Sequence, residues 1–74
     1  MEPEERLMLR ITELCELRNI SLYELSLRSG VPKSTLLSIA EGKSRNPGIR
    51  TISRLADGLD VTLRELFDSE IFED

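Results

Sequence analysis

Residues 21–42 read SLYELSLRSGVPKSTLLSIAEG, and they contain the clearest helix-start and helix-stop signals in the chain. Ser21 and Glu24 have the spacing of a capping box, in which each side chain satisfies an unpaired backbone N–H at the start of a helix. Gly30 is the residue type that most often ends a helix, and Pro32 suits the first turn of the next one. The stretch therefore predicts two short helices that meet at a tight turn, within about residues 21–41.

Three further segments carry apolar residues at helical spacing. They are residues 4–18 (Leu7, Met8, Ile11, Leu14 and Cys15), residues 49–59 (Ile49, Ile52, Leu55, Ala56 and Leu59) and a short segment after Thr62 (Leu63, Leu66 and Phe67). Asn19 tolerates the left-handed conformation that ends a helix, and Thr62 with Glu65 forms a second capping box. The sequence therefore predicts an all-α fold of five helices, with Leu36, Ile39 and Ala40 turned inward from the third.

The composition excludes several classes of protein. The chain has 74 residues, one Cys and no His, so neither an internal disulfide nor a zinc site with enough soft ligands can be assembled. Carboxylates spread over separate helices do not supply a base, a nucleophile and an orienting group, so we expect no catalytic residue, no metal and no cofactor. No apolar run approaches the roughly 18 residues of a membrane span, and we expect a cytoplasmic protein with no membrane partner.

The charges are divided along the chain. The net charge is −4, yet residues 28–54 hold six basic residues and one acid, while the remainder holds four basic residues and thirteen acids. Such asymmetry predicts a positive face opposed by a negative one, although ordinary solvated charge is the alternative interpretation. A basic face is typical of proteins that bind nucleic acid.

The chain resembles the Cro/phage-repressor (Xre-like) helix-turn-helix family of DNA-binding proteins over about residues 7–67. The residues that carry the resemblance are Ile20-Ser21, Glu24-Leu25, Ser29-Gly30-Val31, Ser34-Thr35-Leu36, Ile39, Gly42-Lys43, Asn46-Pro47, Leu55-Ala56, Leu59, Val61 and Glu65-Leu66-Phe67. The resemblance implies a compact five-helix domain of the lambda-repressor type, spanning residues 1–74 as a single unit.

By the same resemblance, the third helix enters the major groove of double-stranded DNA. A helix about 10–12 Å in diameter fits a groove about 12 Å wide. The implied base contacts are Lys33, Ser34, Leu37 and Ser38, and the implied phosphate contacts are Ser21, Lys43, Arg45, Asn46 and Arg50. Plain solvation of a helix surface is the alternative interpretation for the two serines.

Three departures from the family pattern bear on this assignment. Leu22 stands where the family commonly has a DNA-contacting Gln, and we expect it to be exposed. Glu41 places a carboxylate near the expected phosphates. Cys15 and Ala40 replace a buried Arg and Glu that pair in family members, so we expect these two small residues to touch in the core, with Cys15 a packing residue rather than a reactive thiol.

The sequence therefore predicts a transcriptional regulator, repressor-like, that binds DNA as a homodimer. We expect the dimer contact within about residues 62–74, at Leu63, Phe67, Ile71 and Phe72. The alternative is a protein-interaction module with the same fold, such as an antitoxin or the partner of an anti-repressor, which would present Leu22, Leu27 and Leu37.

Overall fold

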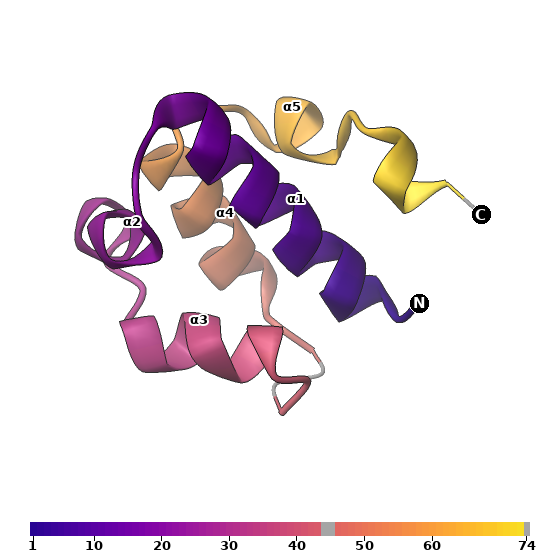
Figure 1. Ribbon diagram of the computed structural model, residues 1–74, viewed down its shortest axis with the longest axis horizontal. Coiled ribbons are helices and arrows are strands. Elements are labelled where there is room, and N and C mark those ends of the chain that lie inside the picture. Colours follow the sequence, from indigo (N-terminus) through magenta and orange to yellow (C-terminus); the bar gives the residue numbers. More distant parts are fainter. Residues whose placement is uncertain (44–45, 74) are drawn as a thin grey trace.

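The computed structural model describes residues 1–43 and 46–73. The elements are α1 (Pro3–Arg18), α2 (Leu22–Ser29), α3 (Lys33–Ala40), α4 (Ile49–Gly58), α5 (Leu63–Phe67) and a 3₁₀ turn, η1 (Glu70–Phe72). Figure 1 shows α3 along one edge of the molecule, next to α2, with α5 and η1 at the opposite edge. The described residues thus form five α-helices at the predicted places, and η1 is an addition that the sequence pattern did not indicate.

The helix ends follow the predicted local chemistry. Asn19 adopts a left-handed conformation with φ 56° after α1. The backbone N–H of Glu65 donates to Thr62 Oγ1 at 3.0 Å, and Thr62 N–H donates back to Glu65 Oε1 at 2.9 Å. At α2 half of the predicted box forms, because Ser21 Oγ accepts from Glu24 N–H at 3.0 Å while the Glu24 carboxylate pairs with Arg28 at 3.7 Å.

The turn between α2 and α3 is fixed by its own backbone. Gly30 has φ 75°, a left-handed conformation that costs glycine little, and its N–H donates to the carbonyl of Ser26 at 3.0 Å. Ser29 Oγ accepts from the N–H of Val31 at 3.1 Å, and the Val31 side chain is buried. The two short helices are therefore held at a defined angle.

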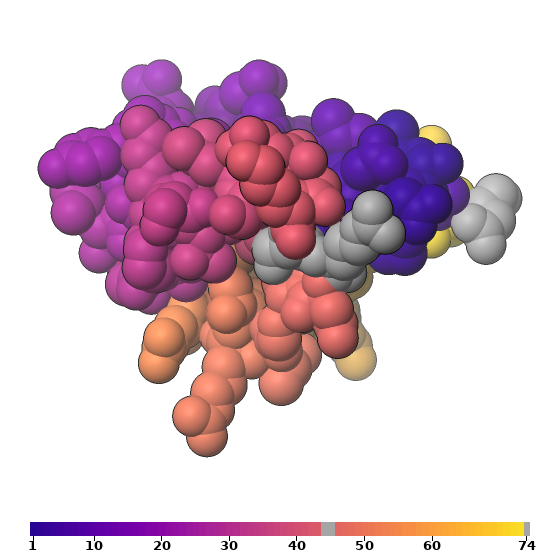
Figure 2. All heavy atoms as spheres, turned by 90° about the horizontal axis from the view of Figure 1, so that it is seen from below, coloured from indigo at the N-terminus to yellow at the C-terminus, as the bar shows by residue number. Residues whose placement is uncertain are grey.

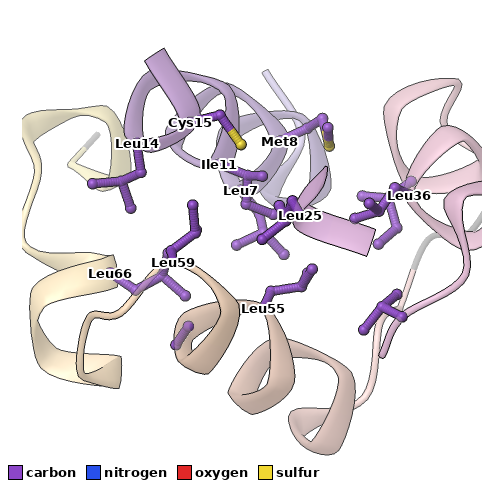
Figure 3. Close-up of a cluster of buried hydrophobic side chains, with 13 residues drawn as sticks. Leu7, Met8, Ile11, Leu14, Cys15, Leu25, Leu36, Leu55, Leu59 and Leu66 are labelled. Atoms are coloured by element: carbon purple, nitrogen blue, oxygen red, sulfur yellow. The ribbon is translucent and has the colours of Figure 1, made fainter. Parts of the chain in front are cut away.

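The core consists of aliphatic side chains together with Met8 and Cys15. Its buried members are Leu7, Met8, Ile11, Leu14, Cys15, Leu25, Val31, Leu36, Ile39, Leu55, Ala56, Leu59 and Leu66, drawn from all five helices and the turn before α3 (Figure 3). Each fully buried Leu or Ile side chain contributes about 1.5–3 kcal/mol of transfer free energy. Cys15 is confirmed as a packing residue.

Two predicted core positions are wrong. Ala40 is exposed, because α3 packs against α1 and leaves its last residue in a surface hollow that Met8 and Thr12 also line, on the N-terminal side of Cys15. Because Ala40 is exposed while Cys15 is buried, the expected contact between the two residues inside the core does not form. Ile49 is 65% exposed, since it is the first residue of α4 and the buried stripe of that helix begins later.

The C-terminal segment is docked on α1 rather than free. The rings of Phe67 and Phe72 lie 4.9 Å apart between centroids, and Arg6 Nη1 donates to the carbonyl of Glu73 at 3.2 Å. Ile71 and Phe72 are half-buried. Ile71 and Phe72, which were expected at the dimer contact, are therefore partly covered within a single copy of the chain.

Candidate nucleic-acid interface

The outward face of α3 is open and carries all four predicted base-contacting residues. Lys33 and Ser34 are exposed, Leu37 is 41% exposed and Ser38 is half-buried, whereas Leu36 and Ile39 on the other side are fully buried. Figure 2 looks onto this face, where α3 lies between α2 and the N-terminal part of α1, with the start of α4 below it. Residues three and four apart share a helix face, so Leu37 lies beside both Lys33 and Ser34, Ser38 lies beside Ser34, and the four side chains form one strip.

Four of the five predicted phosphate-contacting residues can be located. Ser21 is the exposed N-cap of α2, Lys43 follows the end of α3, and Arg50 is exposed in the first turn of α4. Asn46 is exposed and borders a hollow with Pro47 near α5. Arg45 lies outside the described residues.

The ends of α3 and α4 add to this surface. Gly48 is the N-cap of α4 and has no side chain to accept from the first-turn N–H groups. Free N–H groups and the helix dipole together attract an anion such as phosphate. At the C-terminal end of α3, Gly42 has φ 76°, and Lys43 N–H donates to the carbonyl of Ser38 at 2.9 Å. This bond ends the helix and brings Lys43 beside its last turn.

The acidic residues near α3 are arranged around its C-terminal end. The Lys43 ammonium lies 3.5 Å from a carboxylate oxygen of Glu41. A hollow beside them is lined by Glu2, Glu4, Glu5, Ala40, Glu41 and Gly42. Glu41 therefore both neutralises part of the Lys43 charge and borders an acidic surface. Leu22, in contrast, was wrongly expected to be exposed, because it packs half-buried against the core.

One aromatic residue on this side of the molecule was missed by the sequence reasoning. Tyr23, in the first turn of α2, is 58% exposed, and the Lys33 ammonium lies 6.0 Å from the centroid of its ring. The available signal was an aromatic residue two places after the N-cap Ser21, on the outer side of a short helix. Periodicity alone gives such a residue no role.

The described residues give no sign of a metal site, a reactive thiol or a membrane-spanning helix. No group of three His, Cys, Asp or Glu residues within residues 1–43 and 46–73 is placed to hold a metal ion. Burial raises the pKa of the Cys15 thiol, which disfavours the thiolate. No helix among the described residues is long and apolar enough to cross a membrane.

Two short helices joined by a fixed turn, the second of them with an open outward face, define a helix-turn-helix domain within the all-α core. The model of the helix-turn-helix family matches residues 11–66, and the chain belongs to this Xre-like family.

Two curated relatives are transcriptional regulators of Bacillus subtilis (strain 168). The HTH-type transcriptional regulator SlrR is 38% identical over 53 residues, which cover 72% of this chain and 35% of the relative. The HTH-type transcriptional regulator SinR is 34% identical over 61 residues, covering 82% of this chain and 55% of the relative. The chain thus spans between about a third and just over half of these relatives.

Two solved structures that are similar to this chain are controllers of restriction-modification systems. C.AhdI from Aeromonas hydrophila has a TM-score of 0.76 and 31% identity, over 86% of this chain and 96% of that one. A point mutant of the controller protein C.Esp1396I has a TM-score of 0.78 and 19% identity, over 90% of this chain and 86% of that one. The second likeness concerns the fold alone.

Proposed function

We propose that this chain binds double-stranded DNA in a sequence-specific manner and regulates transcription, with α3 in the major groove. The observation that carries the proposal is the open strip of Lys33, Ser34, Leu37 and Ser38 within the segment that matches the helix-turn-helix family. The names of both curated relatives, as transcriptional regulators, support the same function. This role requires DNA binding alone, so we propose no catalytic step. We also propose a cytoplasmic location.

The side chains of the strip suit different base edges. The ammonium of Lys33 can donate to guanine O6 and N7, which are the acceptors that lysine most often reads. Ser34 and Ser38 can donate or accept, so they discriminate less, and the methyl groups of Leu37 can contact the methyl group of thymine. We assign positioning on the backbone to Ser21, Lys43, Arg45, Asn46 and Arg50, because contacts to phosphate fix register without reading sequence.

The partner arrangement that we propose is a homodimer. One recognition helix reaches few base pairs, whereas a two-fold axis would place two copies of α3 about 34 Å apart on one face of the DNA. The operator would then be an imperfect palindrome.

The proposal is tested by selecting duplex sites from a random library and titrating the chain on them across salt concentrations. We expect Lys33→Ala to reduce discrimination at one or two base pairs by about 1–3 kcal/mol. Arg50→Ala should weaken binding to all sequences alike and reduce the salt slope by about one unit. A chain that shows no salt-dependent binding to duplex DNA would overturn the proposal and favour a protein-interaction module.

A further inference from the structure

We infer that Tyr23 is a positioning residue for Lys33, and that its ring sets the sequence discrimination exerted by that lysine. The inference rests on the proposed function, because it assumes that α3 enters the major groove. It adds a residue of α2 to the recognition surface, which the strip on α3 does not include.

The contact joins the first turns of two different helices. The Lys33 ammonium lies 6.0 Å from the Tyr23 ring centroid, within the range of a cation–π interaction. Both ends are fixed, since Ser21 caps α2 and the turn at Gly30 sets the start of α3. The negative face of the ring attracts the ammonium without contributing a carboxylate.

Among the described residues, Lys33 lacks the carboxylate partner that Lys43 and Arg28 have. As the first residue of α3, its ammonium lies at the positive end of the helix dipole, which disfavours a cation. Lys43 pairs with Glu41 and Arg28 with Glu24, but within the described part of the chain no carboxylate pairs with Lys33. A lysine without a partner samples many rotamers of its four-carbon chain.

A neutral ring suits a DNA-facing lysine for an electrostatic reason. A carboxylate at the place of Tyr23 would restrain Lys33, but it would also repel the phosphates and compete with the base for the ammonium. The ring restrains the ammonium and leaves its N–H groups free to donate. Closure of the interface also removes water from the contact, and cation–π interactions strengthen when they are desolvated.

The test is a double-mutant cycle on a selected DNA site and on the same site changed at the base pair that Lys33→Gln affects. We expect Tyr23→Leu to lower discrimination between the two sites about three- to tenfold. Tyr23→Phe should keep it, because the ring remains. Combined with Lys33→Gln, Tyr23→Leu should have no further effect on discrimination. Leu27→Ala, on the outer side of the same helix, is the matched control.

A second measurement reads the contact in the free protein. The methylene protons of Lys33 should be shifted upfield by the ring in the wild type and in Tyr23→Phe, and not in Tyr23→Leu. Three outcomes would overturn the inference while DNA binding itself persists. They are full discrimination between the two sites by Tyr23→Leu, additive effects of the two substitutions in the cycle, and discrimination by Tyr23→Phe that is as low as that of Tyr23→Leu. A wild-type chain that binds no DNA would overturn the proposed function and this inference together.

Discussion

Arg10 in α1 donates from Nε to the backbone carbonyl of Leu66 in α5, over 2.8 Å. Its Nη2 also donates to the carbonyls of Glu65, at 2.8 Å, and Asp68, at 3.3 Å, while its Nη1 pairs with Glu13. The last carbonyls of a helix have no partner within the helix and carry a partial negative charge. One guanidinium therefore caps the end of α5 and attaches it to α1.

We predict that Arg10→Ala lowers the free energy of unfolding by about 2 kcal/mol, since hydrogen bonds from charged groups contribute about 1.5–3 kcal/mol. For a domain of this size the melting temperature should fall by roughly 8–16 °C. Circular dichroism during thermal unfolding measures this. Arg28→Ala is the control, because its ion pair with Glu24 is exposed and should be worth less than about 1 kcal/mol. Equal losses for the two variants would show that the cap contributes no more than an exposed ion pair.

The contact between α2 and α4 depends on a residue without a side chain. A Cβ added to Gly58 would lie 2.9 Å from Ser29 Cβ and 3.0 Å from Leu25 Cδ1. Although alanine normally favours a helix, we predict that Gly58→Ala destabilises the protein by about 1–3 kcal/mol through overpacking. Gly48→Ala is the matched control, since nothing lies within 4 Å of its added Cβ. Denaturant unfolding of both variants decides the matter, and an unchanged midpoint for Gly58→Ala would contradict the prediction.

The sequence predicted the features that local chemistry determines. Five helices and most of the core were predicted from helix spacing and from the residues at helix ends, which are Asn19, Ser21, Gly30 and Thr62. This was possible because caps and periodicity depend on near neighbours in the sequence. Ala40 was misplaced since its burial depends on which part of α1 lies opposite α3. The carbonyls bonded by Arg10 lie more than fifty residues away in sequence, so no local pattern indicates them.

The features of the candidate site also divide into those that the sequence predicts and those that depend on how the helices pack. The strip on α3 was predicted because four residues at helical spacing share a face once the inward residues are known. The contact between Tyr23 and Lys33 was not, because it depends on the angle at which α2 and α3 meet. The ion pair between Glu41 and Lys43 also depends on the backbone after α3, where Gly42 adopts a left-handed conformation.

The capping box of α5 predicts a pH dependence of stability. The backbone hydrogen bond from Thr62 lowers the pKa of Glu65 below its ordinary value of 4.5, and the Thr62 side chain and the charge of Arg18 act in the same direction. A carboxyl group with a lowered pKa stabilises the fold above its unfolded pKa, and this contribution disappears as the pH falls through the folded pKa. The wild type should therefore melt above Glu65→Gln at pH 7, and the gap should close below pH 4.5. Melting curves from pH 7 to pH 3 check this, and a constant gap would refute it.

The Glu41 carboxylate should weaken DNA binding. It pairs with Lys43 at 3.5 Å and adds a negative charge beside the end of α3, so phosphate must compete for the same ammonium. We predict that Glu41→Gln tightens binding to duplex DNA about two- to fivefold at low salt, with little change in sequence preference. Glu16→Gln makes the same change of charge on the exposed side of α1 and should have a smaller effect. Fluorescence anisotropy titrations compare the variants, and equal gains would assign the effect to net charge alone.

The proposed dimer contact can be narrowed with the structure. Leu63 and Phe67 on α5 are 37% and 42% exposed, whereas Ile71 and Phe72 are half-buried. Phe72 also contacts the ring of Phe67 within the same chain. Loss of Phe72 would therefore change the fold of one copy as well as any contact between copies. Leu63 is the cleaner probe of association.

We predict that Leu63→Ser and Phe67→Ser shift the chain toward monomer, because each removes apolar surface that a second copy would bury. Leu27→Ser is the matched control, since Leu27 is 66% exposed on α2 and should not alter association. Sedimentation across protein concentrations, with free protein and with a selected palindromic site, measures the stoichiometry, and thermal unfolding verifies that each variant is folded. Two copies per site should become one for folded Leu63→Ser, with a loss of apparent affinity that a single half-site does not show. A wild-type monomer under both conditions, with one copy per selected site, would rule the dimer out.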